Sequence, residues 1–399
     1  MTILFILVVY ISALFMLVYG ICKPMRKKRG FAVAASSVIP SNPKITVVVL
    51  AHRQAEELSK LISKLLEQDY VGGIEVLVVL YNTDIYTKNV IERVERNHRN
   101  VRHTHIPEGA HFVDLRKLAV NIGIKAVRTD WFAIMDAYQA PLNAHWISLM
   151  AQHINPDTDL ILGYAQYCNG TTKQTLLQCL AHINFCQTTN RVSAPMLGLI
   201  QNILLRKSSF NLKHLYDQES IKYEVGHICA LIAPLIKAKR MSICTNPEAQ
   251  IVFDLEKKNT SIIIKEYLVE RHFALRTRIG ERINTIIKDV ILPWCTYAIA
   301  ASYGALTILF VRLIGNSFEC FNLMSVMLTS CIWVLFTFSL TILVTRFKRS
   351  LLIYGIEISF FEVLKLSLTL PIMLTFKSMQ TFLERKNYKR KYKVDKNGL

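Results

Sequence analysis

The sequence predicts an α/β protein with a mostly parallel, doubly wound sheet, because apolar β-branched runs alternate with segments of helical periodicity. The first run, Ile45–Leu50, reads ITVVVL, which is typical of a parallel strand buried on both faces. In the segment that follows, Leu58, Leu61 and Leu65 recur at helical spacing. Strands that alternate with helices in this way favour a parallel sheet with helices on both faces.

The same alternation continues along the first 150 residues. Further strands are expected at 75–80, 101–105 and 131–135, and helices at 87–98 and from Lys117 onward. The last of these strands, Trp131–Met135, ends on Asp136 and is followed by turn residues up to Pro141. An acid at the carboxyl end of a buried strand lies where α/β sheets bind ligands or metals.

Composition and charge predict contact with a membrane. The 399 residues are 52% hydrophobic and carry a formal net charge of +19. The basic residues cluster beside long apolar segments, which is the distribution that the positive-inside rule gives at a cytosolic membrane face. We therefore expect membrane lipids as partners. We expect no nucleic acid, because no recognition motif accompanies the charge.

The apolar and basic segments predict five regions. Residues 2–21 carry no charge and are long enough to cross a bilayer, and the basic residues follow them, as in an anchor and not in a cleaved signal peptide. Residues 351–376 contain three charges on one helix side, which favours an interfacial or re-entrant helix. The expected regions are an anchor at 1–22, a basic linker at 23–43, an α/β domain at 44–280, a membrane region at 281–376 with spans at 291–311 and 322–345, and a basic cytosolic tail at 377–399.

Residues 44–280 resemble the family-2 glycosyltransferases of the GT-A fold, most closely the membrane-anchored bacterial members. The resemblance lies in ITVVVLAHRQAEEL, in IEVLVVLYNTDIYT and in KLAVNIGIKAVRTDWFAIMDAY. The last stretch corresponds to the family's helix, apolar strand and Asp-x-Asp motif, which here reads Asp136-Ala137-Tyr138. The resemblance implies a multi-pass protein of the bacterial inner (plasma) membrane with its catalytic-type domain in the cytosol.

The resemblance also implies four nucleotide-binding residues. They are His52, Tyr81, Lys117 and Asp136. Leu80 and Tyr81 stand where the family has two uracil-contacting acids, so Tyr81 either stacks on a base or fills the core. Lys117, like Arg116, either meets a diphosphate or lies on a solvated helix face.

Asp136 carries the metal prediction. The resemblance implies Mg²⁺ or Mn²⁺ on the donor diphosphate, and one carboxylate together with substrate phosphates can suffice for Mg²⁺. The alternative is that Asp136 is an acidic cap at a strand end.

Further motif positions are altered. Where the family carries its run of acids with the general base, this chain reads Gly226-His227-Ile228-Cys229, so the candidate bases are His227 and Glu224, with a structural histidine as the alternative. On the acceptor side Gly198 and Asn202 match the family. Arg271 and His272 also match, and they either meet phosphate or lie at a membrane surface.

Two functions follow from these motifs. The first is a membrane glycosyltransferase of hexosyltransferase type with an atypical active site, which transfers a sugar from a nucleotide-sugar donor to a lipid-linked or cell-surface glycan acceptor. The alternative is a catalytically impaired relative that scaffolds or regulates a polysaccharide-assembly complex. The lost acids favour the second function, so whether the chain is an enzyme is left open.

Overall fold

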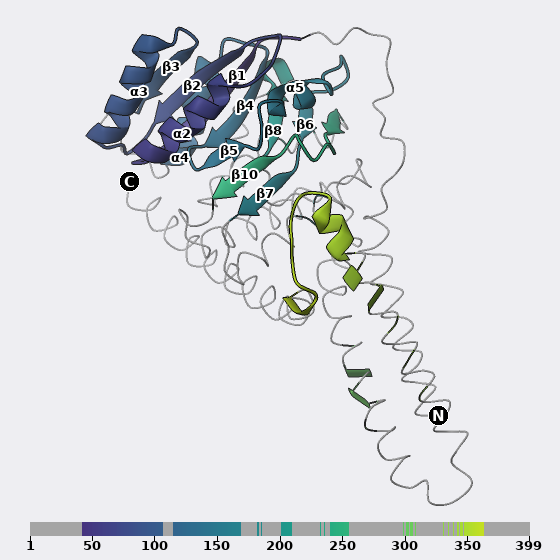
Figure 1. Cartoon of the computed structure of the whole chain (residues 1–399). Helices are drawn as coiled ribbons and strands as arrows, with labels where there is room; N and C mark the ends of the chain where they lie inside the picture. Colours follow the sequence, from purple (N-terminus) through teal and green to yellow (C-terminus); the bar gives the residue numbers. More distant parts are fainter. Residues whose placement is uncertain are drawn as a thin grey trace, which may run out of the picture. The chain divides into compact units, whose positions relative to one another are not determined.

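The computed structural model describes residues 42–106, 115–168, 201–209, 240–254 and 347–362, and isolated residues between 182 and 345 (Figure 1). These residues belong to two compact units. The described residues between 42 and 254 lie in one unit, and those between 298 and 362 lie in the other. The first unit holds every strand of the described part of the chain.

The first unit is built on a seven-stranded sheet with the order β3-β2-β1-β4-β8-β6-β9. Its strands are β1 (Ile45–Ala51), β2 (Ile74–Leu80), β3 (Val101–His105), β4 (Trp131–Asp136), β6 (Leu160–Leu162), β8 (Ile203–Arg206) and β9 (Met241–Ile243). All neighbouring strands are parallel except at β8, which runs antiparallel to both β4 and β6. The predicted mostly parallel α/β sheet is therefore confirmed.

The chain changes direction across the sheet at β1. It proceeds from β1 outward to β2 and β3, and then returns to form β4 on the other side of β1. In the parallel register Leu50 of β1 lies beside Asp136 of β4, and Ala51 lies beside Leu80 of β2. The carboxyl ends of β1 and β4 thus flank a topological switch point, which is where open α/β sheets bind ligands.

Helices cover both faces of this sheet (Figure 1). They are α2 (Ala55–Leu66), α3 (Ile85–Asn97), α4 (Leu115–Ala126) and α5 (Trp146–Ala151). Along β1, Val48 and Leu50 pack with α4, whereas Val47 and Val49 pack with α2, α3 and α5. This period of two on an almost wholly apolar strand explains the run ITVVVL, because both faces of the strand are buried.

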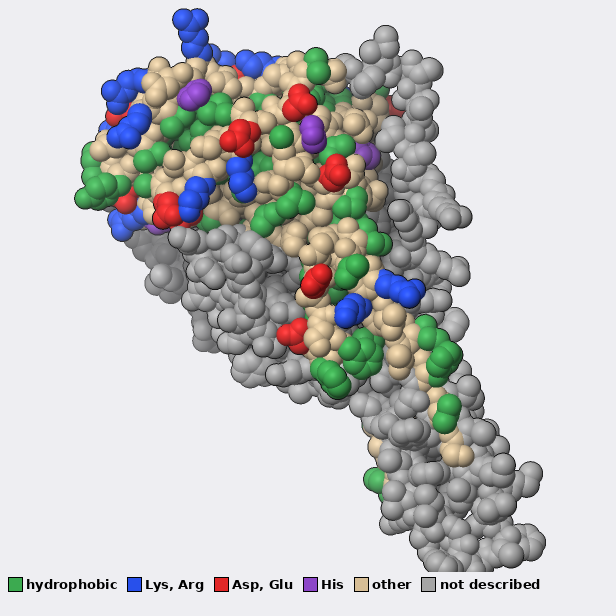
Figure 2. All heavy atoms as spheres, in the orientation of Figure 1, with side chains coloured by type: hydrophobic (Ala, Val, Ile, Leu, Met, Phe, Trp, Pro, Cys, Tyr) green, Lys and Arg blue, Asp and Glu red, His purple; other side chains and the backbone are tan. Residues whose placement is uncertain are grey.

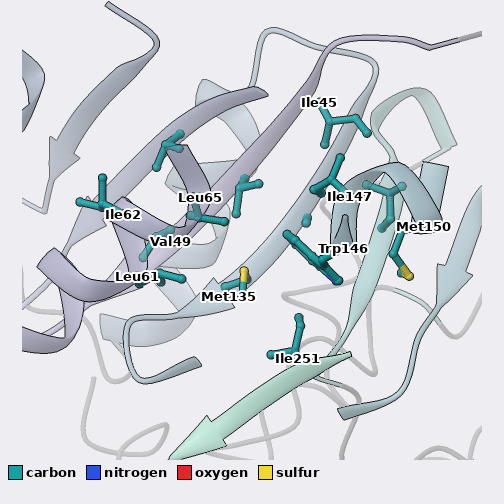
Figure 3. Close-up of a cluster of buried hydrophobic side chains, with 14 of the residues drawn as sticks. Ile45, Val49, Leu61, Ile62, Leu65, Met135, Trp146, Ile147, Met150 and Ile251 are labelled. Carbon is teal, nitrogen blue, oxygen red and sulfur yellow. The ribbon is translucent and has the colours of Figure 1, made fainter. Parts of the chain in front are cut away.

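Figure 3 shows the core on the α2 and α5 side. Val49 and Met135 of the central strands lie between the apolar residues of α2 and the Trp146 side chain of α5. Trp146 is 1% exposed and Trp131 is 2% exposed, as expected for core residues. Each large apolar side chain buried in this way contributes about 1.5–3 kcal/mol.

On the opposite face, Gly123 lets α4 approach the sheet closely. A Cβ atom at this position would lie 2.7 Å from Cγ1 of Val48 and 3.2 Å from Cγ2 of Val79. Both neighbours are β-branched strand residues with little rotamer freedom. The glycine therefore sets the distance between the sheet and the helix that carries Arg116 and Lys117.

A smaller sheet with the order β5-β10-β7 adjoins the end of β4 in sequence. It is formed by β5 (Gln139–Pro141), β7 (Ala165–Cys168) and β10 (Ile251–Asp254). β10 pairs antiparallel with β5 and parallel with β7. It brings the chain near residue 250 back to the turn that follows Asp136.

A buried acid, Asp159, connects the chain at strands β6, β8 and β9. Asp159, 3% exposed, accepts hydrogen bonds from Arg206 (3.1 Å) and Arg240 (3.1 Å), and Arg240 Nε forms a second contact with it. Burial by itself would raise the pKa of Asp159, but hydrogen bonds from Arg240 and Ser209 and the two guanidinium charges lower that pKa overall. The guanidinium of Arg206 also lies 4.9 Å from the ring centroid of Trp131.

Figure 2 shows the charges on one face of this unit. Basic and acidic side chains are interspersed there, and no continuous patch of one sign is seen among the coloured residues of this face. Ion pairs also run along the helices, between Lys60 and Glu56 on α2 and between Lys88 and Glu92 on α3.

The second unit contains the described part of the predicted membrane region. Residues 347–352 are helical and are followed by a turn in which Gly355 has φ +75°. Ser359 then begins a new helical turn, with its N–H donated to Glu362 (3.1 Å) as in a capping box. The segment 351–376, expected to be one helix, is therefore interrupted within its described part.

The predicted localisation as a multi-pass inner-membrane protein is wrong on this structure. None of the helices formed by the described residues is long and apolar enough to cross a bilayer. The anchor at 1–22 lies outside the described residues, as do most of 291–311 and 322–345.

Candidate site at the carboxyl edge of the sheet

The candidate site lies where β2, β1 and β4 end. Neighbouring strands are about 4.8 Å apart, so the three carboxyl ends lie within about 10 Å of one another. The residues that follow these ends are His52 after β1, Tyr81 after β2 and the turn after Asp136 in β4. The fold thus brings three of the four predicted nucleotide-binding residues to one edge.

His52 and Tyr81 form a stacked pair. Their ring centroids are 5.4 Å apart with an interplanar angle of 21°. The imidazole Nδ1 of His52 is also 3.1 Å from the backbone carbonyl oxygen of Tyr81. Both side chains are half-buried, so Tyr81 is not fully absorbed by the core, whereas its neighbour Leu80 is 1% exposed.

Two backbone turns at this edge lie in the left-handed region. Arg53 has φ 45° and Asn82 has φ 44°, and each is the second residue after its strand. For residues other than glycine this conformation costs about 1 kcal/mol or more, less for asparagine. Such strain gathers at ligand-binding and catalytic sites.

Asp136 is 4% exposed and is held by two side chains. Arg116 Nη2 lies 3.1 Å from Oδ1 and 2.9 Å from Oδ2 of this carboxylate. The hydroxyl of Tyr138 donates to Oδ2 at 3.0 Å, and the Tyr138 ring packs edge-to-face on Phe253, 5.0 Å away. The position of the family's second motif acid is thus filled by a hydrogen-bond donor to the first acid.

A pair of glutamines extends this network. The backbone N–H of Asp136 donates to Gln139 Oε1 at 2.9 Å, and Gln139 Nε2 donates to Gln201 Oε1 at 2.6 Å. Gln139 is 2% exposed. Gln201 directly precedes Asn202, one of the predicted acceptor-side residues, and Gln139 links it to Asp136.

Lys117 lies in the first turn of α4 beside Arg116 and is 7% exposed. The solvated-face alternative for Lys117 is therefore not what the structure shows. A role in diphosphate binding stays a prediction for this residue. The side chain of its neighbour Arg116 reaches Asp136.

Asn202 lies in the core, although the resemblance implied contact with an acceptor. Its Oδ1 accepts from Trp146 Nε1 at 3.0 Å, and its Nδ2 donates to the carbonyl oxygens of Tyr164 (2.9 Å) and Ala249 (2.8 Å). The side chain is 1% exposed, and Gly163 leaves the space it fills. These contacts explain the asparagine structurally, and acceptor binding by it stays a prediction.

The remaining predicted residues lie outside the described part of the chain. They are the candidate bases Glu224 and His227 and the acceptor-side residues Gly198, Arg271 and His272. Their roles stay predictions.

The described residues do not fit a resident divalent cation. Asp136 is the one motif acid present, and both its oxygens already contact a guanidinium. Within the described ranges, no group of three or more His, Cys, Asp and Glu residues could hold a metal ion. A cation at this carboxylate would have to compete with Arg116 for the same two oxygens.

Sequence reasoning missed Gln139 and Tyr138 as parts of this network. Gln139 was interpreted as a turn residue, and its contacts depend on the chain folding back from Asp136 onto β5. Arg116 was noted beside Lys117, but its contact with Asp136 joins positions 20 residues apart. No local pattern in the sequence signals that contact.

Fold and site together define an α/β domain of the kind that binds a ligand at a sheet switch point. Residues 46–211 match the family model described as glycosyl transferase family 2. The match is confined to this segment, and it confirms the sequence-based recognition of a family-2 glycosyltransferase pattern. No curated protein matches the chain.

The comparison with solved structures also gives matches. The mannosyltransferase PcManGT from Pyrobaculum calidifontis, in complex with GDP-Man and Mn²⁺, has a TM-score of 0.50 and 14% identity, and the match covers 88% of this chain and 96% of that one. S. aureus TarS 1-349 has a TM-score of 0.38 and 14% identity, with 66% and 80% covered. At these identities the likeness concerns the fold, and the GT-A-like fold is confirmed.

Proposed function

We propose that the family-2 domain binds a nucleotide-sugar donor at the carboxyl edge of β1, β2 and β4 and transfers the sugar to a glycan or lipid-linked acceptor. The observation that carries this proposal is the convergence of His52, Tyr81 and the Arg116–Asp136 pair at the switch point. The site therefore has an aromatic pair, which can stack on the nucleotide base, and a cation, which can bind the diphosphate.

The His52–Tyr81 pair is suited to the base of the donor. The two stacked, half-buried rings present a flat polarizable surface beside the end of β1. The bond of His52 to the Tyr81 carbonyl fixes the imidazole before any ligand arrives. A surface held in this way loses little side-chain entropy on binding.

The left-handed turns at Arg53 and Asn82 support a ligand at this edge. Both turns redirect the backbone directly after a strand, where it would otherwise continue past the switch point. We interpret their backbone strain as the consequence of shaping this edge for a ligand.

A second function has a specific observation in its favour. The carboxylate of Asp136, which is the metal-binding acid in the family pattern, is engaged by Arg116 and Tyr138. A domain that binds donor without transferring sugar would act as a scaffold or regulator in a glycan-assembly complex. Binding and turnover therefore have to be measured separately.

The test is isothermal titration calorimetry on the full chain with GDP-mannose and UDP-N-acetylglucosamine as probes. We expect at least one probe to bind, and Tyr81→Ala to weaken its binding by about fivefold through loss of stacking. Tyr86→Ala is the matched control, because Tyr86 is 73% exposed on α3. No binding of either probe at millimolar concentration, with or without Mn²⁺, would contradict the proposal.

Release of the nucleoside diphosphate then separates the two functions. Steady release in the presence of a glycan or lipid-linked acceptor supports the transferase. Binding without release across acceptors supports the scaffold.

A further inference from the structure

We propose that the diphosphate of the donor is bound without a divalent cation, and that Arg116 supplies the positive charge at the end of β4. This inference rests on the proposed function and concerns the same site. It starts from the disagreement between the metal that the family pattern implies and the side chains present around Asp136.

The geometry places the guanidinium outside the carboxylate. The side chain of Arg116 is 25% exposed and that of Asp136 is 5% exposed, while Nη2 lies within 3.1 Å of both carboxylate oxygens. A ligand that approaches from solvent therefore meets a positive group before it meets the negative one. An anionic diphosphate is attracted by the outer guanidinium and is kept away from the carboxylate behind it.

Two further residues, Tyr138 and Gln139, hold Asp136 of the Arg116–Asp136 pair in place. Tyr138 donates to Asp136 and packs on Phe253, and Gln139 accepts the backbone N–H of the same aspartate. Asp136 thereby acts as a positioning residue for Arg116. A guanidinium fixed in one orientation is well suited to phosphate, because its planar fork matches two phosphate oxygens.

A divalent cation would meet three obstacles at this carboxylate. It would have to displace Arg116 from both oxygens, it would then lie close to a positive charge, and it would find Tyr138 in place of a second acid. Hard cations prefer several oxygen ligands. The arrangement favours the guanidinium over the metal.

The first test is calorimetric titration of the full chain with GDP and with UDP, in EDTA and again in MnCl₂. For the nucleotide that binds, we expect the dissociation constants in the two conditions to agree within about threefold. Binding that requires Mn²⁺ would overturn the inference and leave the proposed function intact. Absence of binding in both conditions would overturn the proposed function, and this inference with it.

The second test concerns Arg116. We expect Arg116→Ala to weaken metal-free binding by about tenfold or more, and Arg116→Lys to have an intermediate effect, because lysine keeps the charge and loses the fork. Arg128→Ala is the matched control: Arg128 is exposed and follows the opposite end of α4. Circular dichroism establishes that each variant is folded. Unchanged binding in folded Arg116→Ala would overturn the assignment.

Asp136→Asn separates the two readings even if Arg116→Ala fails to fold. A metal-dependent site would lose about tenfold or more in affinity with its only motif acid. In a site that relies on Arg116, the amide oxygen of asparagine can still accept a hydrogen bond from the guanidinium, so Arg116 keeps its position while a nearby negative charge is lost. We therefore expect metal-free binding to persist within about threefold. Loss of metal-free binding in a folded Asp136→Asn would contradict the inference.

Discussion

His182 shows how a single residue sets a response to pH. It is fully buried, its Nδ1 is 3.2 Å from the hydroxyl of Tyr164, and the rings of Tyr164 and Phe185 are 5.0 Å apart. Burial lowers the pKa of His182 from 6.5 to about 3. The imidazole is therefore neutral in the folded protein at neutral and mildly acidic pH.

We predict that this histidine makes the fold less stable in mild acid. The unfolded chain binds a proton near pKa 6.5 and the folded chain does so only near 3, so stability falls as the pH drops below 6.5. Between about pH 7.5 and pH 5 the loss is about 2 kcal/mol. Denaturant unfolding of wild type and His182→Gln at both pH values measures it.

The variant is expected to lose that share of the pH dependence. Its stability at neutral pH is also expected to be lower, because the buried packing changes, so the comparison uses the difference between the two pH values. The exposed His98, replaced by Gln, is the matched control. An equal pH dependence in wild type and His182→Gln would contradict the prediction.

At the scale of elements, the position of α4 decides the position of the site. The helix carries Arg116 in its first turn and rests on β1 and β2 through Gly123. Any group added at residue 123 would push the helix away from Val48. The Arg116–Asp136 contact, 2.9 Å long, would then be strained or broken.

We predict that Gly123→Ala destabilises the protein by about 1–2 kcal/mol, since overpacking outweighs the better helix propensity of alanine. Nucleotide binding should weaken as well, because the helix moves. Denaturant unfolding and calorimetry measure the two effects. Gly304→Ala is the control: Gly304 is also helical, and a Cβ there would meet no described atom within 4 Å. A neutral Gly123→Ala would show that α4 can move at little cost.

The same scale shows which sequence patterns were sufficient. Strands β1 to β4 and helices α2 and α3 were predicted within a few residues, because each is a local run with its own period and most of its buried face is apolar. The short strands β5, β7, β9 and β10 were not predicted. They have three or four residues each, and they exist only because distant segments meet.

For the molecule as a whole, ligand binding and folding are linked. A nucleotide that binds only the folded domain stabilises it by about 2.7 kcal/mol at one hundred times its dissociation constant. We predict this gain for the nucleoside diphosphate that binds, in EDTA as well as in Mn²⁺, measured by denaturant unfolding. Arg116→Ala should reduce the gain at the same nucleotide concentration. Calorimetric binding without any gain in stability would mean that the nucleotide binds the unfolded chain equally well.

The sequence by itself determined the resemblance to family-2 glycosyltransferases, the central parallel sheet and the position of Asp136 at the end of a strand, because these depend on local periodicity and on a motif read in order. Its apolar content did not determine localisation, since none of the helices formed by the described residues is long and apolar enough to cross a bilayer. Only the tertiary structure decided what surrounds Asp136. Arg116, Tyr138 and Gln139 reach it from a helix and a turn, and such contacts follow from how the elements pack and not from their spacing in the chain.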